Sequence, residues 1–314
     1  LFALESQEPV KNFDFLGITL QYEMCYTNIL QILDLSNIPL QSKDRTAEDP
    51  IVIGGGPCSY NPEPIADFFD LFYIGEGETQ YENLINLYRK CRDAGVSRQE
   101  FLKEAGKLPG IYCPQFYQVE YKEDGTIAIF SPVKEGVPAT VLKEIVMDVS
   151  DCYYPTKTVV PYIKATQDRV VLEIQRGCIR GCRFCQAGQL YRPVRERDVE
   201  MLKEYAIKML KSTGHEEISL SSLSSSDYTQ LEELMEKLLS WTEKEKVNIA
   251  LPSLRVDNFS DKLMGYLSKV RRSGLTFAPE AGTQRLRDVI NKNLTEEEIL
   301  TTCANAFSGG WNNV

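Results

Sequence analysis

The chain carries two separate series in which a short apolar strand is followed by a helix, and this alternation limits the fold more than any other feature of the sequence. In the first series we expect strands at 13–20, 51–53 and 71–74 and helices at 26–34, 64–69 and 79–92. Strands that alternate with helices usually pair in parallel, with each helix returning the chain across the sheet. The sequence therefore predicts an α/β fold whose ligand side lies at the carboxyl ends of the strands.

The second series begins near Val170, after a stretch in which the periodicity is lost. We expect four strands, at 170–175, 217–222, 247–254 and 275–279, and helices at 199–211, 227–246, 261–270 and beyond. Between the two series, alternation across 112–130 with a Glu-Asp-Gly turn predicts a β-hairpin. The expected divisions are a half-domain at 1–93, a connector with a β-hairpin at 94–165, and a second βα domain at 166–314.

Composition excludes several classes of protein. A formal net charge of −10 argues against a surface built for nonspecific nucleic-acid binding. The single histidine, His215, leaves little room for a zinc hydrolase with several histidine ligands or for a serine triad. No apolar run approaches the roughly 20 residues of a membrane span, and residues 1–5 do not resemble a signal peptide. We therefore expect a cytoplasmic protein that does not enter a membrane.

Three of the nine cysteines, Cys178, Cys182 and Cys185, follow the first strand of the second series at C-x3-C-x2-C spacing. In a chain without an export signal, such clustering indicates metal ligation rather than disulfides. Three thiolates can hold three irons of a 4Fe–4S cluster and leave the fourth iron to an outside ligand, whereas a zinc site normally needs four ligands. Three arginines within the segment favour the thiolate form: Arg176, Arg180 and Arg183.

This segment resembles the signature of the radical S-adenosylmethionine (radical SAM) superfamily, in which an aromatic residue, here Phe184, precedes the third cysteine. The resemblance implies a Rossmann-like N-terminal half-domain followed by a partial TIM-like (βα) radical SAM barrel. It also implies that the cluster reductively cleaves SAM to a 5′-deoxyadenosyl radical, which abstracts hydrogen from an unknown substrate. An electron donor such as flavodoxin or ferredoxin is the expected partner.

After the second strand of such barrels, many members carry a Gly-Gly-Glu stretch that meets the SAM amino group. Here residues 219–227 read SLSSLSSSD instead, which departs from that motif. Ser221 and Ser222 are candidate SAM contacts, with an ordinary loop as the alternative. We expect Ser226 or Asp227 to cap the next helix.

The loops after the third and fourth strands supply the remaining candidate SAM contacts. Ser253 and Arg255 stand where several family members contact the methionine part of SAM, with a salt bridge as the alternative for Arg255. Glu280 lies in a segment that resembles Gly-Ile-Glu-Ser-Gly, whose acidic residue lies near the SAM ribose. The alternative for Glu280 is a charge that stabilises the next helix at its N-terminus.

The first series resembles the cobalamin-binding-type domain that precedes many radical SAM barrels, and the whole chain resembles an uncharacterised subfamily with this arrangement. The glycines of Gly54-Gly55-Gly56 would let a ligand tail approach the backbone, with a tight turn as the alternative. No Asp-x-His-x-x-Gly motif is present, so cobalt ligation by that histidine is not available to this chain. Cobalamin is therefore an additional candidate cofactor.

Two other functions compete with this interpretation. One is methylthiotransfer, with a second cluster on Cys25, Cys58 and Cys91, although Cys91 falls late in an expected helix. The other is a noncatalytic iron–sulfur or RNA-binding module. Six arginines stand against one acid between Arg176 and Arg197, and they can either engage an anionic substrate such as RNA or pair with acids of the protein.

The two ends of the sequence predict an incomplete barrel. The chain begins without Met, and it ends at Trp311–Val314, where a fifth strand is expected to begin. Because barrels of this family normally use six strands, we expect both domains to be truncated, with an open edge beside the SAM pocket.

Overall fold

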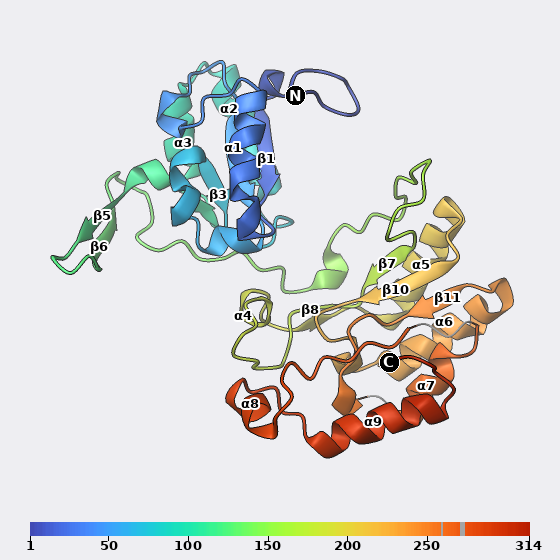
Figure 1. The fold of residues 1–314 in the computed structure, drawn as a ribbon. Helices are drawn as coiled ribbons and strands as arrows, with labels where there is room; N and C mark the ends of the chain where they lie inside the picture. Colours follow the sequence, from blue (N-terminus) through green and yellow to red (C-terminus); the bar gives the residue numbers. More distant parts are fainter. Residues whose placement is uncertain (259, 271–273) are drawn as a thin grey trace. The chain divides into compact units, whose positions relative to one another are not determined.

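The computed structural model describes residues 1–258, 260–270 and 274–314. It divides the chain into two compact units, Leu1–Val146 and Met147–Val314. Each unit is built on parallel strands, which confirms the predicted α/β class (Figure 1). Among the helices that the structure describes, none combines the length and the apolar character needed to cross a membrane.

The sheet of the first unit has four strands in the order β1-β2-β3-β4. They are β1 (Phe15–Thr19), β2 (Ile51–Gly55), β3 (Leu71–Tyr73) and β4 (Ile111–Tyr112). The first three strands are parallel, and β4 pairs antiparallel with β3. The three predicted strands of this series are thus confirmed to within a few residues, and β4 is an addition.

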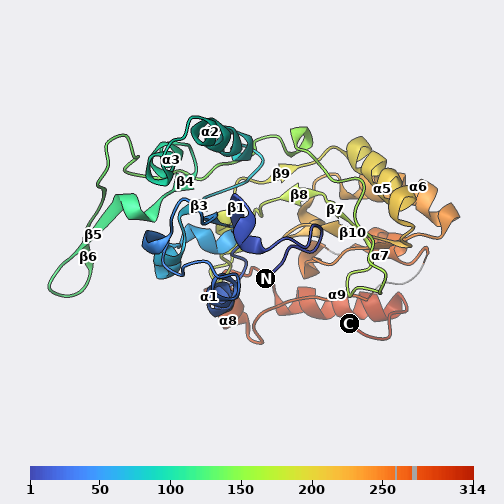
Figure 2. The same ribbon diagram turned by 90° about the horizontal axis from the view of Figure 1, so that it is seen from above.

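Helices cover both faces of this sheet, as Figure 2 shows. Helix α1 (Tyr26–Leu35) lies on one face, and α2 (Tyr81–Asp93) and α3 (Arg98–Ala105) lie on the other. Because both faces are covered, every residue of β3 is buried, as expected for an inner strand. Helix α3 falls in the stretch where we expected no periodic element, and the segment expected as a helix at 64–69 forms a 3-10 helix, Glu63–Phe68.

The predicted hairpin is confirmed. Strands β5 (Tyr117–Tyr121) and β6 (Ile127–Pro132) pair antiparallel, and the chain reverses through Gly125, which has a φ of +80°. Figure 1 shows the hairpin extending from the rest of the first unit. The rings of Tyr117 and Phe130 stack across it.

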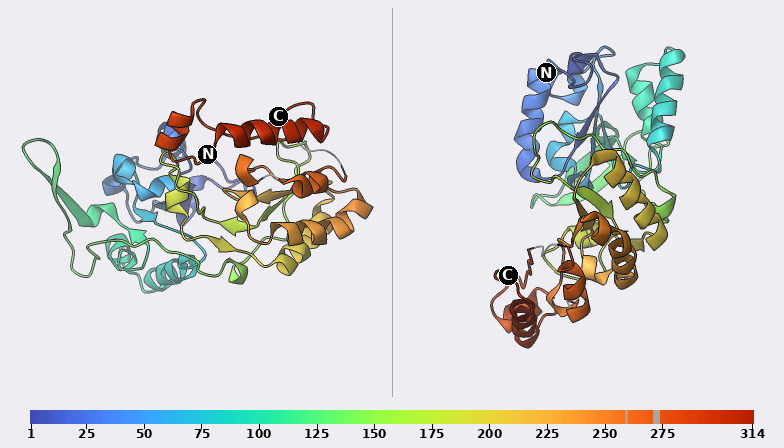
Figure 3. Two further views of the ribbon diagram at one scale, coloured as in Figure 1. Left: turned by 90° about the horizontal axis from the view of Figure 1, so that it is seen from below. Right: turned by 90° about the vertical axis from the view of Figure 1, so that its right-hand side faces the viewer.

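The second unit contains a parallel sheet in the order β11-β10-β7. Its strands are β7 (Val170–Glu173), β10 (Glu217–Ser221) and β11 (Asn248–Ala250). Helices α5 (Val199–Thr213) and α6 (Leu231–Glu245) pack on one side of these strands (Figure 3). Three further helices follow along the chain: α7 (Asp261–Leu267), α8 (Gln284–Val289) and α9 (Glu296–Ser308).

The fourth strand predicted for this unit, at 275–279, is not formed. Leu275 is buried in the core as expected. However, Pro279 has no N–H to donate to a neighbouring strand, and Glu280 has a φ of +67°, which leaves the extended region. This segment therefore runs past the sheet without pairing.

Candidate iron–sulfur site

The loop that carries the three cysteines is closed at its base by two short strands. Strands β8 (Gln175–Arg176) and β9 (Arg195–Glu196) pair antiparallel, and the short helix α4 (Ala187–Leu190) lies between them in sequence. Gly177 leaves β8 with a φ of +84°. A Cβ on Gly177 would lie 2.7 Å from the carbonyl oxygens of Tyr191 and Pro193, so only glycine fits this crossing.

The three thiols are free and partly exposed. The Cys185 N–H donates to the Cys182 carbonyl oxygen at 3.1 Å, which folds the end of the motif into a turn. The backbone N–H of Arg180 points at Sγ of Cys178, and that of Gly188 points at Sγ of Cys185, both at 3.4 Å. Such donors stabilise sulfur in its anionic form, which is the form that binds iron.

The donor set fits three corners of a 4Fe–4S cluster. Each thiolate would bind a different iron, so the sulfurs need not crowd around one point. Among the residues that the structure describes, no group of three or more His, Cys, Asp or Glu is gathered tightly enough around one point for a single metal ion.

Residues 289–291 bind the cysteine loop through hydrogen bonds. The Arg183 N–H donates to the Ile290 carbonyl oxygen at 2.9 Å, and the Arg183 guanidinium donates to the Val289 carbonyl oxygen at 2.5 Å. The Asn291 side-chain amide donates to the Gly181 carbonyl oxygen at 2.8 Å. The loop therefore depends on residues about a hundred positions downstream.

Arg180 connects the cysteine loop to the loops that follow β10 and β11. Its Nε donates to Oδ2 of Asp227 at 2.8 Å, and its Nη1 donates to Oδ2 of Asp257 at 3.4 Å. The hydrogen bond to Asp227 raises the pKa of Arg180. Burial acts to raise the pKa of Asp227, but hydrogen bonds from Arg180 and Ser224 overcome it and hold that pKa below its usual range. Both groups therefore stay charged.

The predicted SAM contact Arg255 is buried and engaged by the protein. Its Nε and Nη2 donate to the two carboxylate oxygens of Asp257 at 2.9 and 3.0 Å, and Nη2 also donates to the Lys292 carbonyl oxygen at 3.2 Å. The salt-bridge alternative therefore describes this side chain as the structure places it. Arg255 and Arg180 share Asp257, so the two arginines belong to one network.

The serine-rich loop after β10 lies against the loop after β11. Ser222 and Ser225 join through their hydroxyls at 3.0 Å, and the Ser225 N–H donates to the Ser253 carbonyl oxygen at 3.0 Å. Ser221 is the last residue of β10, and its carbonyl oxygen accepts from the Ile174 N–H. The predicted contacts at 221, 222 and 253 are thus close to one another.

The predicted helix cap is wrong, because helix α6 begins four residues later than expected. Gln230 stands before Leu231 at its start and makes no side-chain cap. Asp227 instead binds Arg180, and the Ser226 hydroxyl accepts from the Arg255 N–H at 3.2 Å. Polar residues directly after a strand are the one sequence signal that could have indicated this network, since parallel strands end at a common edge.

Glu280 is joined to the same region through Lys292. Its Oε1 lies 3.3 Å from Nζ of Lys292, whose carbonyl oxygen accepts from Arg255. The Glu280 side chain remains 37% exposed, so it can still meet a ligand. Phe184 is also exposed, at 54%.

The arginines of the basic segment, residues 176–197, make hydrogen bonds within the second unit. Its six arginines donate to acids or carbonyl oxygens, in the pairs Arg176–Glu173, Arg180–Asp227, Arg183–Val289, Arg192–Arg180, Arg195–Pro193 and Arg197–Glu173. Arg176, Arg180 and Arg197 pair with acids, as the pairing alternative expects, whereas the contacts given for Arg183, Arg192 and Arg195 are with carbonyl oxygens.

The cysteines considered for a second cluster are not all brought together. Cys58 is buried in one hydrophobic cluster of the first unit, with Leu20 and Phe72. Cys91 packs against the other cluster, with Phe101. The structure therefore gives the second cluster no common location.

Comparison with known protein families shows to which superfamily the chain belongs. The family model described as "Radical SAM proteins, N-terminal" matches residues 1–114, and that described as "Radical SAM superfamily" matches residues 172–314, which include all three cysteines. The chain belongs to the radical SAM superfamily. Radical SAM proteins use a 4Fe–4S cluster and SAM, as we expected from the motif.

Similar proteins support this membership along most of the chain. An uncharacterized protein of Methanocaldococcus jannaschii is 34% identical over 302 residues, covering 95% of this chain and 56% of the relative. A putative methylthiotransferase of the same organism is 26% identical over 140 residues, covering 42% of this chain and 30% of the relative. This chain therefore spans little more than half the length of the uncharacterized relative, and about a third of the putative methylthiotransferase.

Solved radical SAM structures share the fold at low sequence identity. The cobalamin-dependent S-adenosylmethionine radical enzyme OxsB with aqua-cobalamin bound matches with a TM-score of 0.63 and 17% identity, over 96% of this chain and 40% of OxsB. The radical S-adenosylmethionine methyltransferase TsrM from Kitasatospora setae, with cobalamin and a [4Fe-4S] cluster bound, matches with a TM-score of 0.56 and 12% identity, over 95% of this chain and 55% of TsrM. These matches confirm the predicted order of a Rossmann-like part and a radical SAM part.

Proposed function

We propose that this chain is the core of a radical SAM enzyme whose cluster is held by Cys178, Cys182 and Cys185. The observation that carries the proposal is the convergence of the cysteine loop with the loops after β10 and β11, through Arg180, Asp227 and Asp257. Loops at the carboxyl ends of neighbouring parallel strands are where barrels of this kind bind substrates.

The chain's own residues would position SAM. Cys178, Cys182 and Cys185 would hold a 4Fe–4S cluster, which would supply the electron for splitting SAM into methionine and a 5′-deoxyadenosyl radical that abstracts hydrogen from a substrate. Glu280 offers a carboxylate to the ribose hydroxyls, and the serines after β10 offer hydroxyls. Asp257 keeps the Arg255 guanidinium oriented while its carboxylate also faces Arg180. Excluding water and holding SAM still are the tasks left to the protein.

The test begins with anaerobic reconstitution of the full chain. Replacing Cys178, Cys182 and Cys185 together by alanine should remove bound iron and sulfide and abolish 5′-deoxyadenosine formation under dithionite. Cys303→Ala, in α9, is the matched control and should keep both. Unchanged iron and sulfide in the triple variant would overturn the assignment.

Iron content also separates the alternatives. A single cluster predicts about four irons per chain, whereas a methylthiotransferase-like second cluster predicts about eight. The similarity to a putative methylthiotransferase covers 42% of this chain, and Cys58 and Cys91 pack in different clusters. We therefore expect about four irons. A loaded cluster without 5′-deoxyadenosine formation would favour the noncatalytic module.

Cobalamin is proposed as an additional ligand of the first unit, on the strength of the fold shared with OxsB and TsrM. The chain offers no histidine to cobalt there, because its one histidine, His215, is in the second unit, 3.4 Å from Asp168. Gly54 is no evidence for a ligand tail. A Cβ at this position would lie 2.9 Å from the side chains of Leu20 and Phe72, so packing inside the first unit already requires glycine there. Titration with aqua-cobalamin, followed by its visible absorption, tests the proposal.

The electron donor, the substrate and the cytoplasmic location stay predictions. A flavodoxin or ferredoxin should replace dithionite in the cleavage assay. RNA stays a candidate substrate, although two of the arginines expected to recognise it, Arg176 and Arg197, pair with Glu173.

A further inference from the structure

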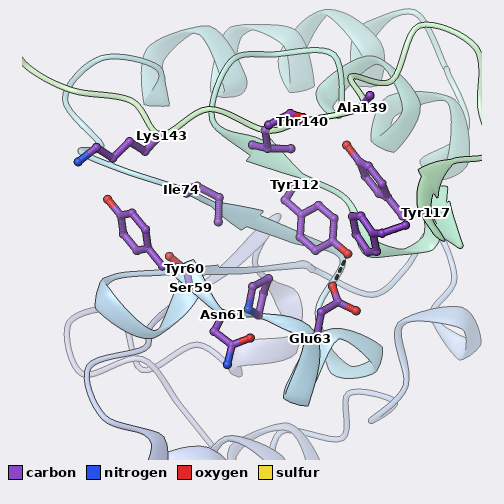
Figure 4. Close-up of a pocket in the computed structure, with 13 residues that line it drawn as sticks. Ser59, Tyr60, Asn61, Glu63, Ile74, Tyr112, Tyr117, Ala139, Thr140 and Lys143 are labelled. Carbon is purple, nitrogen blue, oxygen red and sulfur yellow. Dashed lines mark hydrogen bonds between the residues drawn. The ribbon is translucent and has the colours of Figure 1, made fainter. Parts of the chain in front are cut away.

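A pocket of about 550 Å³ opens in the first unit, where the loop after β2 and the end of β3 meet the hairpin (Figure 4). All of its lining residues lie between Ser59 and Lys143, whereas the three cysteines belong to the second unit. Its volume is within the range of small-molecule sites. The pocket is therefore a candidate binding site separate from the residues assigned to the cluster and SAM.

One wall of the pocket is aromatic. The rings of Tyr117 and Phe130 are stacked, with centroids 5.2 Å apart and planes 12° from parallel, and the Tyr112 and Tyr117 centroids are 4.9 Å apart. Phe130 is 40% exposed, so part of this surface is open to a ligand. Flat aromatic surfaces of this kind stack on planar rings.

A carboxylate lies beside that wall. The Tyr112 hydroxyl donates to Oε1 of Glu63, as the dashed line in Figure 4 shows. Burial, followed by the hydrogen bond to Glu63, holds the pKa of Tyr112 far above its ordinary value, so the hydroxyl stays a donor. Among the residues that the structure describes, no donor reaches Oε2 of Glu63. The tyrosine thus orients the carboxylate and leaves one oxygen as an acceptor.

We propose that this pocket binds a nucleoside-type heteroaromatic base that carries an exocyclic amino group. The ring would stack on the exposed ring of Phe130, which itself stacks on Tyr117, and the amino group would donate to Oε2 of Glu63. A carboxylate can only accept hydrogen bonds, so a base with a keto oxygen at that position is disfavoured. The proposal is independent of the proposed radical chemistry, since it uses only residues of the first unit.

Cytidine and uridine form a matched pair of probes, because they differ only at C4, an amino group against a keto oxygen, and in the proton on the neighbouring N3. Adenosine is avoided because it is part of SAM, and the proposed SAM site would bind it too. We expect cytidine to bind the full chain at least about tenfold more tightly than uridine, measured by calorimetry or saturation-transfer NMR.

Substitutions then locate the site and test the role of the carboxylate. In Glu63→Gln, the amide oxygen still accepts from Tyr112 and the amide N–H₂ faces the ligand, so the preference should reverse towards uridine. Phe130→Ala should weaken both nucleosides by similar factors. Tyr121→Ala is the control, because Tyr121 lies on the same hairpin, is 66% exposed and does not line the pocket; it should leave both affinities unchanged.

Three results would overturn the proposal. They are equal affinity of the unmodified chain for the two nucleosides, no binding of either, and loss of both in Glu63→Gln without a reversal. Thermal unfolding of each variant shows whether loss of binding comes from loss of the fold. We expect both variants to keep the fold, because the Phe130 and Glu63 side chains are exposed.

Discussion

Arg180, which stands between the first two cysteines of the motif, donates from Nε to Oδ2 of Asp227 at 2.8 Å. Asp227 is nearly buried, with 4% of its side chain exposed. The same guanidinium reaches Asp257, which binds Arg255. One arginine of the cysteine motif therefore joins the cysteine loop to the loops after two neighbouring strands, and two aspartates balance its charge.

Removing the charge of Asp227 tests this connection. Asp227→Asn should lose about 1.5–3 kcal/mol of charge-assisted hydrogen bonding and leave the cysteine loop less well held. We expect the visible absorption of the reconstituted cluster to bleach several-fold faster in air. Glu232→Gln is the control, because its ion pair with Lys262 is exposed and contributes little. Equal bleaching rates in all three proteins would show that Asp227 does not support the loop.

Two glycines with similar backbone angles provide a matched test of the loop's geometry. Gly177 and Gly214 have φ values of +84° and +74°. A Cβ on Gly177 would meet carbonyl oxygens at 2.7 Å, whereas one on Gly214 would meet nothing within 4 Å. Gly214→Ala should therefore cost about 1–2 kcal/mol of backbone strain, and Gly177→Ala should cost more and also reduce cluster loading. Chemical denaturation and iron analysis measure the two effects, and equal losses would contradict the crowded crossing at Gly177.

The SAM contact predicted for Glu280 can be tested apart from the cluster. Glu280→Gln should keep iron content and weaken SAM binding by about 1.5–3 kcal/mol, or roughly ten- to a hundredfold. Lys292→Met removes the cation that lies 3.3 Å from Glu280 and reports how much that pairing contributes. Unchanged SAM affinity in a cluster-loaded Glu280→Gln protein would remove this residue from the site.

The stability of the second unit should depend on pH through Glu173. Burial acts to raise the pKa of Glu173, but hydrogen bonds from Arg176 and Arg197 overcome it and hold the pKa below its ordinary value of 4.5. A carboxyl group whose pKa is lowered by folding stabilises the protein above about pH 4.5 and loses that contribution as the pH falls through the lower folded value.

Glu173→Gln should therefore reduce the free energy of unfolding by about 1–3 kcal/mol at pH 7, since Arg197 is only 1% exposed and would lose its counter-charge. The difference from the unmodified chain should shrink below pH 4.5. Denaturant unfolding at several pH values measures it. A difference that does not change with pH would mean that packing, and not charge, accounts for the loss.

Much of the fold could be predicted because apolar spacing reports burial directly. The strands at 13–20 and 51–53 and the helix at 199–211 lie within a few residues of β1, β2 and α5. Helix α3 was missed because it is short, although Ser97 followed by Glu100 carries the sequence of a helix start, and the Ser97 side chain accepts from the Glu100 N–H. The strand at 275–279 was wrong because apolar spacing does not weigh a proline and a residue with positive φ.

The sequence is enough to propose the cysteine ligands of the candidate site, but not the contacts that support their loop. The spacing of the cysteines and the strand before them are local features, so sequence contains them. The pairing of Arg180 with Asp227, 47 positions away, depends on how β7 and β10 are aligned. Asp257 and Asn291 were missed for the same reason, since each meets the cysteine loop only after the chain has folded.

The bond between Asn291 and Gly181 spans 110 positions of the chain. During synthesis the cysteines therefore leave the ribosome roughly 5–20 s before Asn291, at usual rates of elongation. In that interval the loop lacks its contacts with residues 289–291. Iron delivered then would meet thiols whose spacing these contacts do not yet hold, so we expect cluster retention to follow the docking of residues 289–291.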